Sequence, residues 1–188
     1  MPDSEVENMK HVRGGLMAIL VLATAASAYA AKPLVQQMLP VKGDVKGFAI
    51  LAGSLQYGKG KDLTKIYNGA VDLYVNNGVI DAARQLYHRK SDYLEVTIHA
   101  MKSEKAALDF LKYWQKQNKV KSLSKTKTCT SFTVTKPTVM SYFVVGKYFA
   151  TVGAFYSVER ARGDVKAFAT VIEKRILKLT KPVKGKAQ

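Results

Sequence analysis

Apolar residues recur with the period of an amphipathic helix in three segments of the chain. The first segment follows Asp62, a suitable N-cap, and stops at Gly78, which predicts a helix over 62–75. The second follows Ser103 and predicts a helix over 103–117, and the third follows Asp164 and predicts one over 164–178. The predicted inner faces comprise Leu63, Ile66, Tyr67, Ala70, Val71 and Tyr74; Ala106, Ala107, Phe110, Leu111 and Trp114; and Val165, Phe168, Ala169, Ile172 and Ile176. Gly69 interrupts the first face and suggests a close packing contact there.

Alternating and short apolar runs predict strands between these helices. Residues 79–88 and 93–101 flank a polar turn at 89–92, and 139–145 and 148–155 flank Gly146-Lys147, which suits a two-residue hairpin. Shorter strands are predicted over 47–55 and 131–135, and a simple turn over 58–61.

Hairpins alternating with helices are typical of an α+β fold. We expect a two-layer domain over residues 47–180, with an antiparallel sheet and helices on one face. A hairpin followed by a helix occurs at 79–117 and again at 139–178, which suggests a ββα duplication. Residues 31–46 contain two prolines and a glycine and read as an extended segment before the domain, and 181–188 read as a basic tail.

The first thirty residues have the layout of a secretory signal peptide. Lys10, His11 and Arg13 precede an uncharged apolar stretch over 16–26, and Ala28 and Ala30 occupy the small-residue positions of a cleavage site. The stretch is shorter than the roughly 20 residues of a membrane-spanning helix, although a retained membrane anchor is an alternative. Residues 1–8 are acidic, which suggests that the true start is Met9. We therefore expect a periplasmic or secreted bacterial protein with no transmembrane helix after cleavage.

Cleavage changes the charge of the chain only slightly. The precursor has 188 residues and a formal charge of +16, and the removed part carries three acidic and two basic residues, which leaves +17. Cys129 is the single cysteine, so the chain forms no internal disulfide and no cysteine-based zinc site. We expect Cys129 to be buried, with an intermolecular disulfide as the alternative.

Candidate chemistry is sparse in the remaining chain. No serine-hydrolase, zinc-protease, CxxC or P-loop motif occurs, so no cofactor, metal or catalytic residue is predicted. His99 shares a strand face with Glu95, but about 13 Å of strand separates them, so they do not touch. A ligand-binding or enzymatic pocket between the 63–75 helix and the sheet would use Tyr67, Tyr74, Glu95 and His99. The alternative is that the two tyrosines belong to the core.

The excess of lysine is the most unusual feature of the composition. Such a surface attracts polyanions, whereas export and the absence of a recognition motif argue against nucleic acid as the partner. The leading hypothesis is a non-catalytic domain that binds an anionic envelope lipid, a polysaccharide or an acidic protein. The alternative is that the lysines only keep the protein in solution. The candidate anion-binding residues are Lys59, Lys61, Lys116, Lys119, Lys121, Lys125 and Lys127.

The segment from Tyr67 to Tyr74 has the pattern Tyr-Asn-Gly-Ala-x-x-Leu-Tyr and is followed by Asn77-Gly78. It resembles a signature of an uncharacterised family of exported bacterial proteins, a domain of unknown function. The resemblance extends over roughly residues 45–115 and more loosely over the final hairpin and helix. It implies a fold and export, and it implies no reaction.

Overall fold

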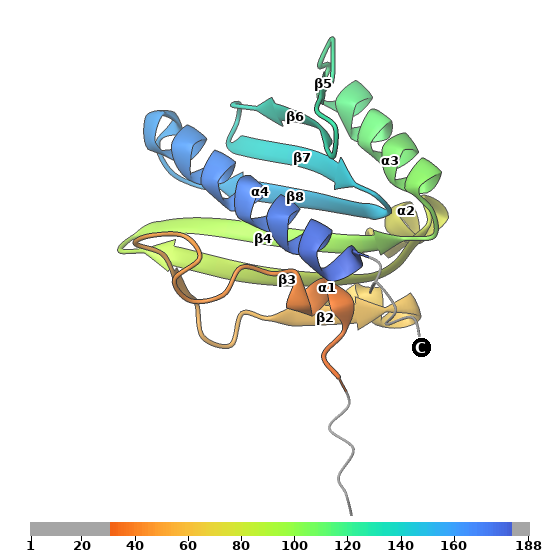
Figure 1. Cartoon of the computed structure of the whole chain (residues 1–188), viewed down its shortest axis with the longest axis horizontal. Helices are drawn as coiled ribbons and strands as arrows, with labels where there is room; N and C mark the ends of the chain where they lie inside the picture. Colours follow the sequence, from red (N-terminus) through yellow and green to blue (C-terminus); the bar gives the residue numbers. More distant parts are fainter. Residues whose placement is uncertain (1–30, 182–188) are drawn as a thin grey trace, which may run out of the picture. The chain divides into compact units, whose positions relative to one another are not determined.

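An eight-stranded antiparallel sheet forms the centre of the molecule, as Figure 1 shows. The computed structural model describes residues 31–181, and the described residues from Lys32 onward form one compact unit. The strand order is β1-β3-β4-β8-β7-β6-β5, and β2 also pairs with the outer edge of β3. The strands are β1 (Ala49–Ile50), β2 (Gln56–Lys59), β3 (Val79–Arg89), β4 (Asp92–Met101), β5 (Ser124–Lys125), β6 (Thr130–Val134), β7 (Val139–Val145) and β8 (Tyr148–Ala154).

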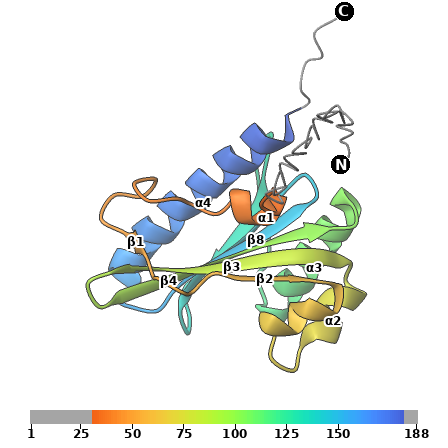
Figure 2. The ribbon, with the colours of Figure 1, turned by 90° about the horizontal axis from the view of Figure 1, so that it is seen from below.

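Helices cover both faces of this sheet. The short α1 (Leu34–Gln37) and the long α4 (Val158–Thr180) share one core, while the 3₁₀ helix η1 (Gly60–Lys65) and α3 (Glu104–Gln117) share another. Neighbouring residues of β8 therefore point to opposite faces of the sheet: Tyr148 belongs to the α4 core and Phe149 to the α3 core. Figure 2 shows α4 and α2 (Val71–Asn76) on opposite sides of the sheet. The α+β class and the antiparallel sheet are confirmed, but the helices divide between the two faces instead of sharing one.

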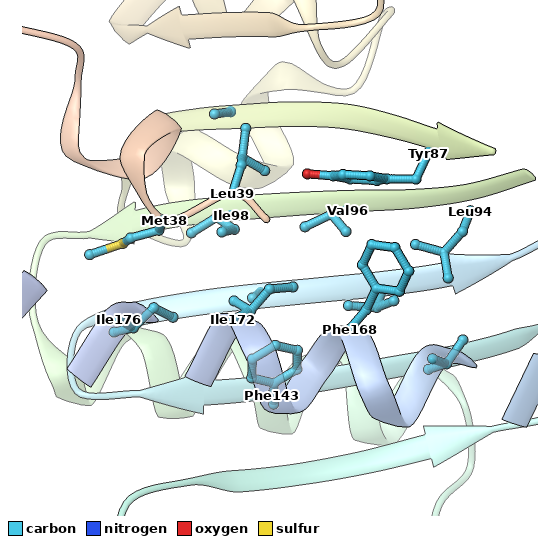
Figure 3. Packing of buried hydrophobic residues seen from close by; sticks show 14 of the residues in the cluster. Met38, Leu39, Tyr87, Leu94, Val96, Ile98, Phe143, Phe168, Ile172 and Ile176 are labelled. Atoms are coloured by element: carbon cyan, nitrogen blue, oxygen red, sulfur yellow. The ribbon is translucent and has the colours of Figure 1, made fainter. Parts of the chain in front are cut away.

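The core beneath α4 is the larger of the two (Figure 3). Phe168, Ile172 and Ile176 of α4 pack against Leu94, Val96 and Ile98 of β4, and all six are almost completely buried. Burying each such side chain contributes roughly 1.5–3 kcal/mol. Val35, Met38 and Leu39 fill the same core, so the prediction of an extended segment over 31–46 is wrong.

The two long hairpins form where the alternation predicts them. Lys90-Ser91 joins β3 to β4, and Gly146-Lys147 joins β7 to β8 with a positive φ at Gly146. Each hairpin leads into a helix, so the ββα order does occur twice. The two helices nevertheless pack on opposite faces of the sheet. In the observed strand order, the rotation that relates the two hairpins is a two-fold axis normal to the sheet. Such a rotation keeps each face on its own side, so it does not bring α3 onto α4.

The predicted helix over 62–75 is broken into two short helices. Gly69 adopts φ +78° and ends the helical path between η1 and α2, and a Cβ there would meet no atom within 4 Å. The glycine therefore serves the backbone turn and not a close packing contact. Gly58 is the glycine in close contact: it lies in β2, and a Cβ on it would overlap the Asp62 backbone. Residues 58–61 are consequently a strand end and a 3₁₀ start, not a simple turn.

Two further element boundaries differ from the predictions. Only Ala49 and Ile50 of the predicted 47–55 strand are register partners of β3, and after them the Leu51 amide still donates to the Leu86 carbonyl before the chain turns away. Helix α4 begins at Val158, six residues before Asp164, whose carboxylate pairs with Arg89 and does not cap the helix. The signal peptide, the start at Met9 and residues 182–188 of the tail lie outside the described residues.

Candidate functional site

A cavity of about 150 Å³ lies on the α3 side of the sheet. All four candidates for a pocket between the 63–75 segment and the sheet line it, namely Tyr67, Tyr74, Glu95 and His99. Seven further residues line the cavity that no sequence pattern predicted for a pocket: Arg84, Thr97, Trp114, Met140, Tyr142, Phe149 and Thr151. The structure therefore brings residues from six separate segments of the chain to one cavity.

Strand register builds the floor of this cavity. Arg84 of β3 lies opposite Thr97 of β4, which lies opposite Thr151 of β8, which lies opposite Tyr142 of β7. Register partners on adjacent antiparallel strands point to the same face, so these four side chains form a row across the sheet. The alternation of Glu95, Thr97 and His99 along β4 signalled one polar face, but only the strand order reveals the neighbours from β3, β8 and β7.

Aromatic rings form much of the remaining wall. The rings of Tyr67 and Tyr74 stack with their centroids 3.5 Å apart, although Gly69 interrupts the helix between them. Trp114 of α3 stacks on Tyr142 at a centroid distance of 5.7 Å, and Phe149 closes the wall from β8. Flat, polarisable surfaces of this kind favour a ligand that is itself flat.

His99 is held neutral at the buried end of the cavity. Its Nδ1 lies 2.9 Å from the Phe149 carbonyl oxygen, which can only accept, so Nδ1 carries the proton. Nε2 is then an acceptor, and the Tyr67 hydroxyl donates to it. Complete burial lowers the pKa of His99 to about 4. Both ring nitrogens are thus engaged, and the imidazole offers no free base to a bound molecule.

The tyrosines of the cavity are also poor acids. Burial raises the pKa of Tyr67 well above its ordinary value, and the neighbouring Tyr74 adds to the effect. Burial is likewise the main cause that raises the pKa of Tyr74 to about 12. Both hydroxyls therefore keep their protons at neutral pH, and they act as hydrogen-bonding groups and not as nucleophiles.

Arg84 and Glu95 place one charge of each sign at the other end of the cavity. Arg84 donates from Nε and Nη2 to Gln56 Oε1, and its Nη1 lies 3.8 Å from Glu95 Oε2, which is beyond hydrogen-bond distance. Burial raises the pKa of Glu95, and the Arg84 charge opposes that rise. The two charges balance, so the cavity has no formal charge.

The indole nitrogen of Trp114 is closed off from solvent and has no partner among the described residues. Its Nε1–H is buried and makes no hydrogen bond to any residue that the structure describes. An unmade hydrogen bond of this kind costs about 1–3 kcal/mol. The apolar stripe of its helix predicts Trp114 on the inner face, but nothing in the sequence indicates that the indole nitrogen lacks an acceptor.

The candidate anion-binding lysines are all exposed but do not form one surface. Lys59 lies in β2 and Lys61 in η1, beside β3, whereas Lys125 lies in β5 at the far edge of the sheet. Lys116 ends α3 near that far edge, and Lys119, Lys121 and Lys127 follow in the connections on either side of β5. The lysine ion pairs within residues 31–181 involve Lys65, Lys105 and Lys112, and none of the seven candidates.

No cluster of three or more histidine, cysteine or acidic side chains within 31–181 could hold a metal ion. In the same part of the chain, no helix combines the length and the apolar character needed to span a membrane.

Comparison with known proteins adds little to this geometry. No protein-family model and no curated protein matches the sequence. Among solved structures, the extracellular domain of PknH from Mycobacterium tuberculosis is similar, at 9% identity and a TM-score of 0.49, over 79% of this chain and 95% of that one.

Proposed function

We propose that this protein binds a small, flat and largely apolar molecule in the cavity on the α3 side of the sheet, without transforming it. The observation that carries the proposal is the convergence of Tyr67, Tyr74, Glu95 and His99 with the aromatic rings of Trp114, Tyr142 and Phe149 around one cavity. Well-formed apolar cavities with a few convergent polar groups are the usual ligand sites of proteins.

The size of the cavity limits the ligand. A volume of about 150 Å³ accommodates a single benzene-sized molecule. Larger ligands would have to extend past Arg84 and Glu95, the half-buried charged residues of the lining. We therefore favour a molecule built on one ring over a lipid chain or an oligosaccharide.

Binding without catalysis follows from the protonation states. The His99 imidazole is neutral, with both nitrogens engaged, and the neighbouring tyrosines remain protonated. Glu95 is the remaining acid–base group of the lining, and the nearest charge is that of Arg84. No nucleophile–base pair is assembled around the cavity from the residues described.

Trp114 provides a direct test, because it is the single tryptophan of the chain and gives one indole N–H resonance. We expect toluene to shift that resonance and to saturate it with a dissociation constant of about 1 mM or lower. Thr151→Met, which fills the floor of the cavity, should abolish the shift, whereas Thr133→Met on the exposed side of β6 should not. A shift that persists in Thr151→Met, or no shift in the wild type, would refute the proposal.

A second candidate function is the binding of an anionic surface by lysines at the β5 edge. The supporting observation is the five exposed lysines between Lys116 and Lys127 that are free of the ion pairs formed within residues 31–181. Their charges would attract an anionic lipid, a polysaccharide or an acidic protein and release its counterions.

Matched pairs of lysines test this second candidate. Lys121→Gln with Lys125→Gln removes two charges at the β5 edge, and Lys59→Gln with Lys61→Gln removes two at the opposite edge. In co-sedimentation with phosphatidylglycerol vesicles, we expect the first pair to weaken binding several-fold and the second to leave it nearly unchanged. Equal effects of the two pairs, or equal binding to neutral phosphatidylcholine vesicles, would argue against a localised anion site.

We also propose that the mature domain acts outside the cytoplasm, in the periplasm or as a secreted protein. The support is the basic, apolar and small-residue pattern of residues 10–30. Expression of the full chain followed by N-terminal sequencing of the exported product should give Ala31 as the first residue. Retention of the intact N-terminus in the cytoplasm would contradict the proposal.

A further inference from the structure

We propose that the ligand of the cavity is a single aromatic ring that carries a neutral amide group, whose carbonyl accepts from Arg84 and whose N–H donates to Glu95. This ligand class rests on the ligand-binding function proposed above. It adds a polar head group and an orientation to the size and flatness that the cavity already requires.

Arg84 and Glu95 keep hydrogen-bonding capacity that the protein does not use. Gln56 Oε1 accepts from Nε and Nη2 of Arg84, so Nη1 remains. Nη1 lies 3.8 Å from Glu95 Oε2, and neither oxygen of Glu95 accepts a hydrogen bond from a residue within 31–181. A ligand can therefore bind both side chains without displacing a hydrogen bond that the protein already makes.

Both groups are open to a ligand on the cavity side of the sheet. Within residues 31–181, the side-chain atoms that are closed off from solvent without a partner belong to Trp114 and Arg175. Arg84 Nη1 and the Glu95 oxygens are therefore accessible, and both residues line the cavity. Burial is the main cause that raises the pKa of Tyr67, while the charge of Arg84 opposes the rise and that of Glu95 adds to it. Both charged groups thus lie near the aromatic wall.

An amide group matches the spacing of these two side chains. Its nitrogen and oxygen lie roughly 2.3 Å apart, and one N–H of a primary amide points the same way as the C=O bond. Two hydrogen bonds of about 2.9 Å that diverge slightly reach atoms 3.8 Å apart, which is the distance from Arg84 Nη1 to Glu95 Oε2. The amide thus bridges two groups that are too far apart to bond to each other.

The charges at this end of the cavity favour a neutral head group. Arg84 and Glu95 balance each other, so a neutral ligand leaves both charges compensated. A carboxylate would attract Arg84 but repel Glu95, and an ammonium group would attract Glu95 but repel Arg84. An amide meets neither repulsion, and each of its two hydrogen bonds is strengthened by a charged partner.

The head group also sets the direction of the ring. Arg84 lies on β3 and Glu95 on β4, whereas Trp114 stacks on Tyr142 of β7, with β8 between β4 and β7. A ligand that holds the charged pair with its amide therefore directs its ring across the sheet towards these aromatic side chains.

Benzamide and acetophenone form a matched pair of probes, since an NH₂ group in the first takes the place of a methyl group in the second. An amide is more strongly hydrated than a ketone, so a cavity without partners for the amide would prefer acetophenone. In isothermal titration of the wild-type protein, we expect benzamide to bind roughly tenfold more tightly than acetophenone. Benzoate and benzylamine, charged probes of similar size, should bind more weakly than benzamide.

Glu95→Met tests the acceptor directly, because methionine is similar in length but does not replace the carboxylate as an acceptor. We expect the variant to bind benzamide roughly tenfold more weakly and acetophenone within about twofold of the wild type. Glu173→Met makes the same substitution in α4, on the opposite face of the sheet, and should bind both probes as the wild type does.

The outcomes separate the two proposals. Equal affinities of the wild type for benzamide and acetophenone, or tightest binding of benzoate or benzylamine, would overturn the amide class while the cavity still binds rings. Equal losses for benzamide and acetophenone in Glu95→Met would overturn it as well. Failure of all four probes to bind wild-type protein would overturn the ligand-binding function itself. If Glu95→Met does not fold, the wild-type affinities decide the question alone.

Discussion

At the scale of single residues, His99 makes the stability of the fold depend on pH. Its pKa is about 4 in the folded protein and about 6.5 in the unfolded chain, so acidification protonates the unfolded state first. The free energy of unfolding should therefore be unaffected by His99 above pH 6.5 and should fall by about 3 kcal/mol in total as the pH drops from 6.5 to 4.

Urea unfolding of wild-type protein and His99→Gln at pH 7.5, 5.5 and 4 measures this loss. Glutamine can donate to the Phe149 carbonyl and accept from Tyr67, but it does not titrate. We expect the variant to lose less stability on acidification than the wild type, and Glu95 titrates in both proteins, so its contribution cancels. A variant slope equal to that of the wild type would exclude His99 as the cause.

Cys129 should be an unreactive thiol, which bears on whether two chains can be joined through it. The side chain is half-buried, and burial, assisted by the charge of Glu173, raises its pKa to about 11. At pH 8 the thiolate is scarce, so iodoacetamide should alkylate native protein about a hundredfold more slowly than the urea-unfolded chain. Equal rates in the two states would show that the thiol is exposed and ionised as an ordinary cysteine.

At the scale of elements, local patterns predict the hairpins better than the helix boundaries. The alternation along 79–101 and 139–154 correctly predicts strands. In each of these strands, one face points to the α4 core and the other points to the α3 core or the cavity. The apolar stripe over 62–75 is equally regular, but Gly69 at φ +78° outweighs it and divides the helix. An apolar stripe indicates which side chains are buried, but it does not indicate where the backbone turns.

The start of α4 failed as a prediction for a different reason. Asp164 has the residue type of an N-cap, yet it accepts two hydrogen bonds from Arg89 and one from the Tyr156 hydroxyl. Arg89 ends β3, so this contact joins the hairpin end to the long helix across 75 residues of sequence. Such a partner is invisible to any local pattern.

The same contact predicts a substantial effect of mutation. Asp164→Asn keeps the shape of the side chain but leaves Arg89 without its bidentate carboxylate, and we expect a loss of about 2 kcal/mol in the free energy of unfolding. Asp109→Asn, which breaks only exposed pairs with Lys105 and Lys112, should leave the unfolding midpoint unchanged. Urea titration followed by circular dichroism compares the two, and similar midpoints would show that the Arg89 pair adds nothing to stability.

At the scale of the whole molecule, the candidate site depends on the order of the strands. Four residues of the site could be selected from the sequence because each lies in a recognisable helix or strand pattern, namely Tyr67, Tyr74, Glu95 and His99. Their neighbours Arg84, Thr151 and Tyr142 could not, because they reach the cavity only through the β3-β4-β8-β7 order, in which β4 pairs with a strand 50 residues away in the chain. The candidate anion-binding lysines are the opposite case. They were chosen together because they share a residue type, but the fold places them at two opposite edges of the sheet.

The shared sheet should make the two cores unfold as one unit. Ile172 is completely buried in the α4 core, and Trp114 reports from the α3 core on the other face. Ile172→Ala should lower the free energy of unfolding by about 3 kcal/mol, because it leaves a cavity in the buried core. Because the same strands carry both cores, tryptophan fluorescence and far-ultraviolet circular dichroism should give coincident midpoints, both shifted from the wild type. Val75→Ala on the exposed side of α2 should move neither. A fluorescence midpoint that stays at the wild-type value while the dichroism midpoint falls would show that the α3 face, with its cavity, is an independently stable layer.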